Sequence, residues 1–171
     1  MEQVILVNAR GEAIGSMEKI EAHRKGLLHR AFSIFLFNRQ GEMLLQRRAP
    51  SKYHFAGLWS NACCSHPRPG ENTAEAAERR LREELGVEAE LKEIAVIRYC
   101  FFDPSSGLTE HEMDHVFVGF CDAPLSPDPQ QTDALRWVSA RELSKEMQSN
   151  PSCFTPWFRF ILENVSVQPA G

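Results

Sequence analysis

A thiol and an imidazole two residues apart, Cys64 and His66, stand out as side chains that could do chemistry. A cysteine can act as a nucleophile or as an acid/base group, and histidine is a common metal ligand. A segment rich in glutamate and arginine follows, and it ends with Glu83 and Glu84. This combination predicts that the stretch 59–86 is the chemical centre of the protein.

A second set of side chains has the donor types of a metal site. Glu110 and Glu112 are two residues apart in a predicted strand, so they share one face of it. His111 and His115 are expected on the opposite face and are left out. Three imidazoles with one or two carboxylates suit Zn²⁺ or Mn²⁺ better than Mg²⁺, although a single histidine is more often structural. The predicted set is His23, His29, His66, Glu110 and Glu112.

A third set is cationic and comes from several parts of the chain. Guanidinium groups bind the oxygens of a diphosphate in pairs, and ammonium groups add positive charge. The alternative is a solvated basic turn over residues 47–52. The cations in question are Lys19, Lys25, Arg47, Arg48, Lys52 and Arg80.

The alternative to a chemical role for Cys64 is a packing role, because free cysteines are often small buried apolar residues. Its expected place in a loop, beside a candidate metal ligand and before a helix, favours a chemical role. Nearby cations are expected to lower the pKa of its thiol. Cys63 is expected to face the other way and to pack in the core.

The helix after this loop has clear boundaries in the sequence. Asn72 followed by Glu75 is a capping-box pattern, and Gly86 is typical of a helix C-terminus. Arg80 and Glu84, four residues apart, are expected on one face. Four residues at helical spacing are predicted to face the core: Ala74, Ala77, Leu81 and Leu85.

The remaining elements should form a sheet around this helix. Alternation and turn residues predict strands over 4–7, 31–37, 43–47, 58–62, 90–102, 112–121 and 135–138. A short helix over 17–25 is expected to be capped by Ser16 and stopped by Gly26. Further helices are expected to begin at Ser139 and at Thr155-Pro156. The predicted fold class is α/β (α+β), with a mixed, largely antiparallel sheet flanked by helices.

Length and composition are those of one globular domain, 1–171, with an N-terminal strand and turn extension over 1–15 and a frayed tail over 165–171. The net charge of −4 argues against nucleic acid as a partner, and no apolar run is long enough for a membrane span. The N-terminus is not typical of a signal peptide. Five cysteines, an odd number, indicate free thiols and a cytoplasmic location.

The helix carries a pattern that resembles the Nudix box. The pattern G-E-x7-R-x-L-x-E-E-x-G-V runs from Gly70 to Val87, and in the full box several carboxylates hold divalent metal against a diphosphate. Ser65 replaces the leading glycine, and Arg80 replaces a glutamate. Exchanging a metal ligand for a cation weakens the case for hydrolysis and strengthens diphosphate binding. The alternative is a charged surface helix.

Several segments together resemble the type 1 isopentenyl-diphosphate Δ-isomerase family, which has a Nudix-type fold. These segments are A-H-R-K-G-L-L-H-R-A-F-S, Q-R-R-A-P-S-K, N-A-C-C-S-H-P, R-R-L-R-E-E-L-G, T-E-H-E-M-D-H-V-F and F-T-P-W, in unbroken order. The resemblance implies interconversion of isopentenyl and dimethylallyl diphosphate in isoprenoid biosynthesis. The alkene must gain one proton and lose another, which requires two acid/base groups.

The resemblance also implies roles for individual residues. Cys64 matches the catalytic cysteine, Glu112 the second acid/base group and Tyr99 a tyrosine that assists proton delivery. One Mn²⁺ or Zn²⁺ would bind the His/Glu set named above. Glu84 matches the residue that holds Mg²⁺ on the diphosphate, and no flavin is expected. The matching substrate contacts are Lys19, Arg48, Lys52 and Arg80, with Trp157 as an aromatic wall.

Two other functions remain open from the sequence. One is a Nudix hydrolase of a nucleoside diphosphate derivative, and the other is a metal-stabilised module that binds diphosphates without turnover. The expected partner is a small-molecule diphosphate, without nucleic acid or membrane, and the expected state is a monomer or weak dimer.

Overall fold

Strand β3 (His29–Phe37) is the centre of a mixed nine-stranded sheet in the computed structural model, which describes residues 1–169. It pairs in parallel with β8 (Leu108–Phe120) and antiparallel with β6 (Cys63–Ser65). It also meets β1 (Gln3–Val7) and β4 (Met43–Arg48) at its ends. The other strands are β2 (Ala13–Glu18), β5 (Trp59–Ser60), β7 (Leu91–Asp103) and β9 (Thr132–Val138). The predicted fold class is confirmed.

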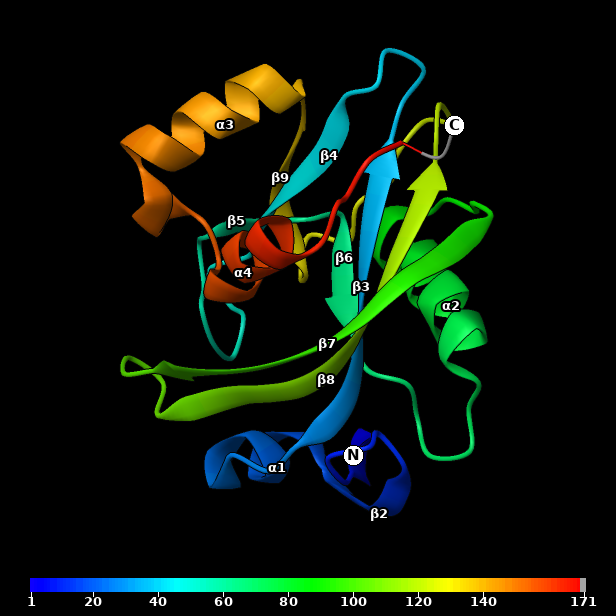
Figure 1. Ribbon diagram of the computed structural model, residues 1–171, viewed down its shortest axis with the longest axis vertical. Helices are drawn as coiled ribbons and strands as arrows, with labels where there is room; N and C mark the ends of the chain where they lie inside the picture. The colour runs from blue at the N-terminus through cyan, green and yellow to red at the C-terminus, as the bar shows by residue number, and fades with distance from the viewer. Residues whose placement is uncertain (170–171) are drawn as a thin grey trace.

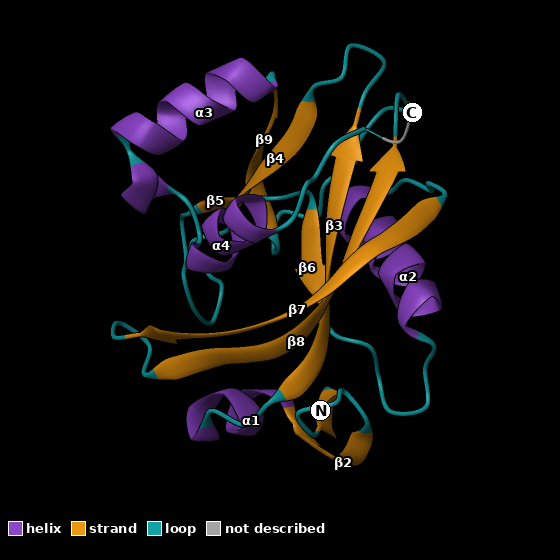
Figure 2. Cartoon of the chain, viewed as in Figure 1, coloured by secondary structure: helices purple, strands orange, loops and turns teal. Residues whose placement is uncertain are grey.

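Helices cover both faces of this sheet (Figures 1 and 2). Alternate residues of β3 point to opposite faces, so Phe32 and Ile34 lie in one buried cluster and Phe35 in another. The first cluster contains the apolar side of α2 (Thr73–Leu85). The second contains residues of α3 (Ala140–Ser149) and α4 (Pro156–Asn164), which are separated by a short 3₁₀ turn, Pro151–Cys153. Because β3 is buried on both faces, it provides a rigid base for the strands beside it.

The boundaries of α2 confirm the prediction from local sequence. The Asn72 side chain accepts a hydrogen bond of 3.2 Å from the Glu75 amide, and Gly86 ends the helix with a φ of 67°. One predicted core position is wrong: Ala74 is exposed, whereas Ala76 is buried. The apolar stripe is therefore shifted, because β3 and β6 pack against the side of the helix that carries Ala76 and Ala77.

The predicted start of the first helix is also wrong. Ser16 lies within β2, which pairs with β1, and α1 (Lys19–Lys25) begins only after it. Glu18 caps this helix by accepting a 2.7 Å hydrogen bond from the Glu21 amide. Pairing with β1 thus overrides a local capping signal. The predicted stop at Gly26 is confirmed, with a φ of 66°.

The long hairpin of β7 and β8 projects from the sheet, and α1 packs against it (Figure 1). Strand β8 begins four residues before the predicted start at residue 112, so Glu110 and Glu112 both lie in regular strand. Within the predicted segment 58–62 only Trp59–Ser60 is strand, as β5. A further strand, β6, begins directly after the segment and puts Cys64 in a strand and not in a loop.

The chain beyond α4 returns to the core. Val165 and Val167 pack against the second cluster, while residues 170 and 171 of the expected tail lie outside the described residues. Among residues 1–169, no helix is both long and apolar enough to cross a membrane.

Candidate functional site

Five buried side chains converge beside the central strand, and they are those predicted as metal ligands. One nitrogen or oxygen from each lies within 4.8 Å of the others. The five are His23, His29, His66, Glu110 and Glu112. They form a possible metal site, because three imidazoles and two carboxylates are a donor set typical of a transition metal.

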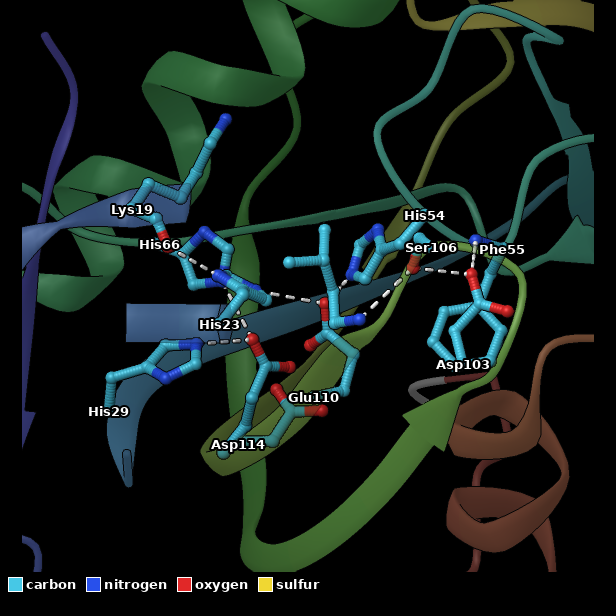
Figure 3. A network of polar contacts seen from close by, with 12 residues as sticks. Lys19, His23, His29, His54, Phe55, His66, Asp103, Ser106, Glu110 and Asp114 are labelled. Atoms are coloured by element: carbon cyan, nitrogen blue, oxygen red, sulfur yellow. Dashed lines mark hydrogen bonds and ion pairs between the residues drawn. The ribbon is translucent and has the colours of Figure 1, made fainter. Parts of the chain in front are cut away.

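The strands explain this convergence. Glu110 and Glu112 share one face of β8, and His29 lies directly opposite Glu112 in the parallel pair β3–β8. His66 follows β6 on the other side of β3. His23 is fully buried because α1 packs against β8. Figure 3 shows these histidines near Glu110, from three separate parts of the chain.

Two of the histidines are oriented as metal ligands usually are. The Nδ1 atoms of His23 and His29 lie 2.7 and 2.8 Å from the carbonyl oxygens of Lys19 and Leu27. A carbonyl only accepts, so each Nδ1 carries a proton and the Nε2 lone pair of the neutral ring faces the cluster. These Nε2 atoms lie 3.1 Å from Glu110 and 3.0 Å from Glu112. The residues present therefore fit a divalent cation between imidazoles and carboxylates.

The electrostatics of the cluster also favour positive charge. Burial acts to lower the pKa of His23, but the Glu110 carboxylate outweighs it and raises this pKa to about 9. Burial acts to raise the pKa of Glu112, but hydrogen bonding to His29 lowers it to about 2. Glu112 is thus ionised at neutral pH, and a bound cation would take the place of the extra proton on the His23 ring.

A hydrogen-bond network extends from Glu112 toward Cys64. The Tyr99 hydroxyl lies 2.8 Å from Glu112 Oε1 and 2.8 Å from Asp114 Oδ2. Ser33 donates to the same oxygen of Asp114 at 2.6 Å. Burial, together with the charge of Glu112, raises the pKa of Asp114 well above its ordinary value. Asp114 was not among the predicted site residues, although its alternation with Glu110 and Glu112 could have revealed it.

The expectation for the Cys64 thiol is wrong in one respect. Burial, reinforced by the Asp114 carboxyl, raises the pKa of Cys64 to about 12 and outweighs the lowering effect of the Arg48 charge. The thiol is protonated at neutral pH and donates to Asn61 Oδ1 at 3.2 Å. Ser33 Oγ lies 3.6 Å from the same sulfur. Cys63 packs in the core beside α2, as predicted.

A polar pocket connects the thiol with the metal-type cluster. Cys64, His66, Glu110 and Glu112 line it. All five residues predicted as substrate contacts line the same pocket: Lys19, Arg48, Lys52, Arg80 and Trp157. The Arg48 guanidinium lies 5.2 Å from the centre of the Trp157 ring. The pocket therefore combines cations, an aromatic wall and two acid/base side chains.

Glu84 lies just behind this pocket and is 4% exposed. Arg80 donates to its Oε2 at 2.7 Å, and the Cys63 thiol donates to the same oxygen at 3.3 Å. Within residues 1–169, the Glu84 side chain accepts two hydrogen bonds, and Oε2 is the acceptor in both. Its second oxygen is thus the one open to another ligand.

The other histidines divide into two groups. His111 donates to the Gly26 carbonyl and His115 pairs with Glu93, so neither joins the cluster, as predicted. His54, which was not among the predicted site residues, lines the pocket and hydrogen-bonds Glu110. His54 and Glu110 are 56 residues apart, so no local pattern connects them. The only sign of His54 in the sequence was its residue type.

Comparison with known proteins gives a consistent result. The family described as NUDIX domain matches residues 27–158. An isopentenyl-diphosphate Delta-isomerase of Serratia proteamaculans is 48% identical over 164 residues, covering 96% of this chain and 91% of that protein. The isomerase of the same name from Halorhodospira halophila is 48% identical over 170 residues, covering 98% and 97%.

A solved structure supports the fold. A crystal structure of a Deinococcus radiodurans protein superposes with a TM-score of 0.77 over 95% of this chain and 98% of that one, at 24% identity. At this identity the likeness concerns the fold alone. The sequence relatives carry the stronger conclusion: this chain has a Nudix domain and belongs to the isopentenyl-diphosphate Delta-isomerase family.

Proposed function

We propose that this protein interconverts isopentenyl and dimethylallyl diphosphate by adding one proton and removing another. The observation that carries the proposal is that one pocket contains a protonated thiol, Cys64, and an ionised carboxylate, Glu112, next to a cluster of cations. A proton donor and a proton acceptor are the two groups that such an allylic rearrangement needs.

The cations would hold the diphosphate and so fix the short apolar tail in the pocket. Lys19, Arg48, Lys52 and Arg80 offer several donors to phosphate oxygens, and Arg80 is oriented by Glu83 and Glu84. When the diphosphate binds, the alkene is placed beside the acid/base groups. The loss of translational and rotational entropy then occurs on binding and does not add to the barrier of the reaction step. Mg²⁺ bound with the diphosphate would be held by Glu84.

In the direction from isopentenyl diphosphate, Cys64 gives its proton to the terminal alkene carbon. A tertiary carbocation results. Glu112 then takes a proton from the methylene carbon that adjoins the cationic carbon on the diphosphate side. The Trp157 ring, which already faces Arg48, would stabilise the positive charge, and burial keeps out water that would trap it. Tyr99, hydrogen-bonded to Glu112, orients that carboxylate.

The His/Glu cluster would hold one Mn²⁺ or Zn²⁺. The ligands would be His23, His29, His66, Glu110 and Glu112. When bound, such an ion supplies Lewis acidity that tunes the proton affinity of a coordinated carboxylate. No flavin is required for this proton-transfer chemistry.

The arrangement of α2 argues against hydrolysis. Arg79 pairs with Glu71 and Glu83, and Arg80 pairs with Glu83 and Glu84. Arginines therefore neutralise Glu71 and Glu83 and occupy one oxygen of Glu84, so only the other oxygen of Glu84 is left for the Mg²⁺ of a bound diphosphate. A helix neutralised in this way is better suited to bind a diphosphate than to cleave it.

The test is incubation of the purified protein with isopentenyl diphosphate and Mg²⁺ in deuterated water without flavin. Dimethylallyl diphosphate carrying solvent deuterium is expected. Unlabelled product would contradict proton addition and removal, and the absence of product would overturn the proposal. Phosphate release from a nucleotide panel would instead indicate a hydrolase, and binding without any product a diphosphate-binding module.

Lys52 should make diphosphate binding depend on pH. Burial, with the nearby Arg48 charge, lowers the pKa of Lys52 to about 8, so its positive charge is present below that pH and lost above it. Affinity for Mg²⁺–pyrophosphate should then fall by about fivefold between pH 8 and pH 9, because the charged fraction of Lys52 falls by that factor. K52R should remove this dependence, because a guanidinium stays charged. Equal pH slopes for the two proteins in calorimetric titrations would contradict this role.

The single domain over 1–171, the monomeric or weakly dimeric state and the cytoplasmic location stay predictions. The same holds for the absence of nucleic-acid and membrane partners.

A further inference from the structure

His54 lies at the junction of the cationic pocket and the His/Glu cluster. It belongs to the segment between β4 and β5 and is 3% exposed. Its ring nitrogens face two different groups. Nδ1 faces Arg48, and Nε2 faces Glu110, which lies beside it in Figure 3. It is therefore the side chain that connects a proposed diphosphate contact with a proposed metal ligand.

The hydrogen bonds define which nitrogen of His54 carries the proton. Arg48 Nη2 lies 3.1 Å from His54 Nδ1 and 3.1 Å from the His54 carbonyl oxygen. A guanidinium only donates, so Nδ1 must be an acceptor and lacks a proton. The proton of the neutral ring is then on Nε2, which donates to Glu110 Oε1.

His23 contacts the same carboxylate oxygen with the opposite tautomer. Its Nδ1 donates to the Lys19 carbonyl, so its Nε2 offers a lone pair to the cluster. Glu110 Oε1 thus lies between one ring oriented as a ligand and one ring oriented as a donor. In this tautomer the lone pair of the neutral His54 ring is on Nδ1, where it accepts from Arg48. His54 is thus not oriented as a ligand, but its Nε2–H can hold the Glu110 carboxylate that is.

The surrounding segment holds His54 in this position. Phe55, the next residue, has a φ of 48°, a left-handed conformation that costs free energy for a bulky residue. Its amide donates to Asp103 Oδ2 at 3.1 Å, which fixes this conformation from the tip of the β7–β8 hairpin. The His54 ring also stacks on Tyr53 at 4.0 Å and on Trp157 at 5.9 Å.

We infer that His54 is a positioning residue that holds Glu110 for a divalent transition metal and connects it to Arg48. The inference rests on the metal site of the proposed function. Carboxylates that bind metals are themselves hydrogen-bonded, and loss of such a partner weakens metal binding. The competing explanation is that the ring only fills space between Tyr53 and Trp157.

Two substitutions separate these explanations. H54Q places an amide NH₂ near the position of Nε2, so it keeps the hydrogen bond to Glu110 but loses the ring. H54F keeps a ring for stacking but cannot donate to Glu110. Metal-stripped proteins are titrated with Mn²⁺ alone, and free Mn²⁺ is followed by electron paramagnetic resonance, so no catalytic activity enters the readout.

H54F should weaken Mn²⁺ binding by about 10- to 100-fold, and H54Q should retain most of the parent affinity. Parent-like binding by H54F, or equally weak binding by both variants, would overturn the role of His54. If H54F does not fold, H54N replaces it, because its shorter amide can accept from Arg48 but cannot reach Glu110. A parent protein that does not bind Mn²⁺ or Zn²⁺ would instead refute the metal site itself, and the inference with it.

Discussion

Cys64→Ala is expected to lower kcat for isomerisation by about 10³-fold or more, because it removes the proposed proton donor. Binding of the diphosphate should survive, since the cations that contact it belong to other parts of the pocket. Turnover is measured from dimethylallyl diphosphate formation, and binding from calorimetry with Mg²⁺ and inorganic pyrophosphate.

Cys63→Ala is the matched control for this experiment. The two cysteines are neighbours in β6, but Cys63 is fully buried against α2 and does not line the pocket. This variant should lose some thermal stability and keep most of its turnover. Substantial turnover by Cys64→Ala, or equal losses in both variants, would refute a role for Cys64 in proton transfer.

Glu112→Gln is expected to reduce kcat by about 10³-fold, because an amide cannot accept the proton that leaves the substrate. Its hydrogen bonds with His29, His66 and Tyr99 show how strongly the carboxylate is held. Metal affinity should fall as well, so activity must be measured over a range of Mn²⁺ concentrations.

Glu110→Gln separates the two losses. Glu110 is proposed to bind metal without transferring a proton, so this variant should bind Mn²⁺ about 10- to 100-fold more weakly and regain activity at high Mn²⁺. Glu112→Gln should not regain it. Recovery of Glu112→Gln at high Mn²⁺ would mean that Glu112 is only a ligand.

Much of the site follows from local sequence. The alternation of Glu110 and Glu112 places both carboxylates on one face of any strand that contains them. The caps of α2 are also local, since Asn72 bonds an amide three residues away. The five metal-type residues could be predicted because their donor types are rare in combination, and the structure brings all five together.

Errors arose where distant strands decide the outcome. Ser16 has the side chain of a helix cap, but pairing with β1 keeps it extended. Ala74 fits helical spacing, yet Ala76 faces the sheet because the sheet determines which side of α2 is covered. Short-range patterns predict that an element exists, whereas its neighbours determine its limits and orientation.

The order of residues was enough to identify the donor types, their spacing and the family resemblance that pointed to a diphosphate isomerase. The protonation of Cys64, the tautomer of His54 and the raised pKa of the Asp114 carboxyl depend on the tertiary structure. The physical reason is that a pKa or a tautomer depends on burial and on nearby charges and hydrogen bonds. Those neighbours are brought together by the pairing of β3 with β6 and β8, from positions far apart in the chain.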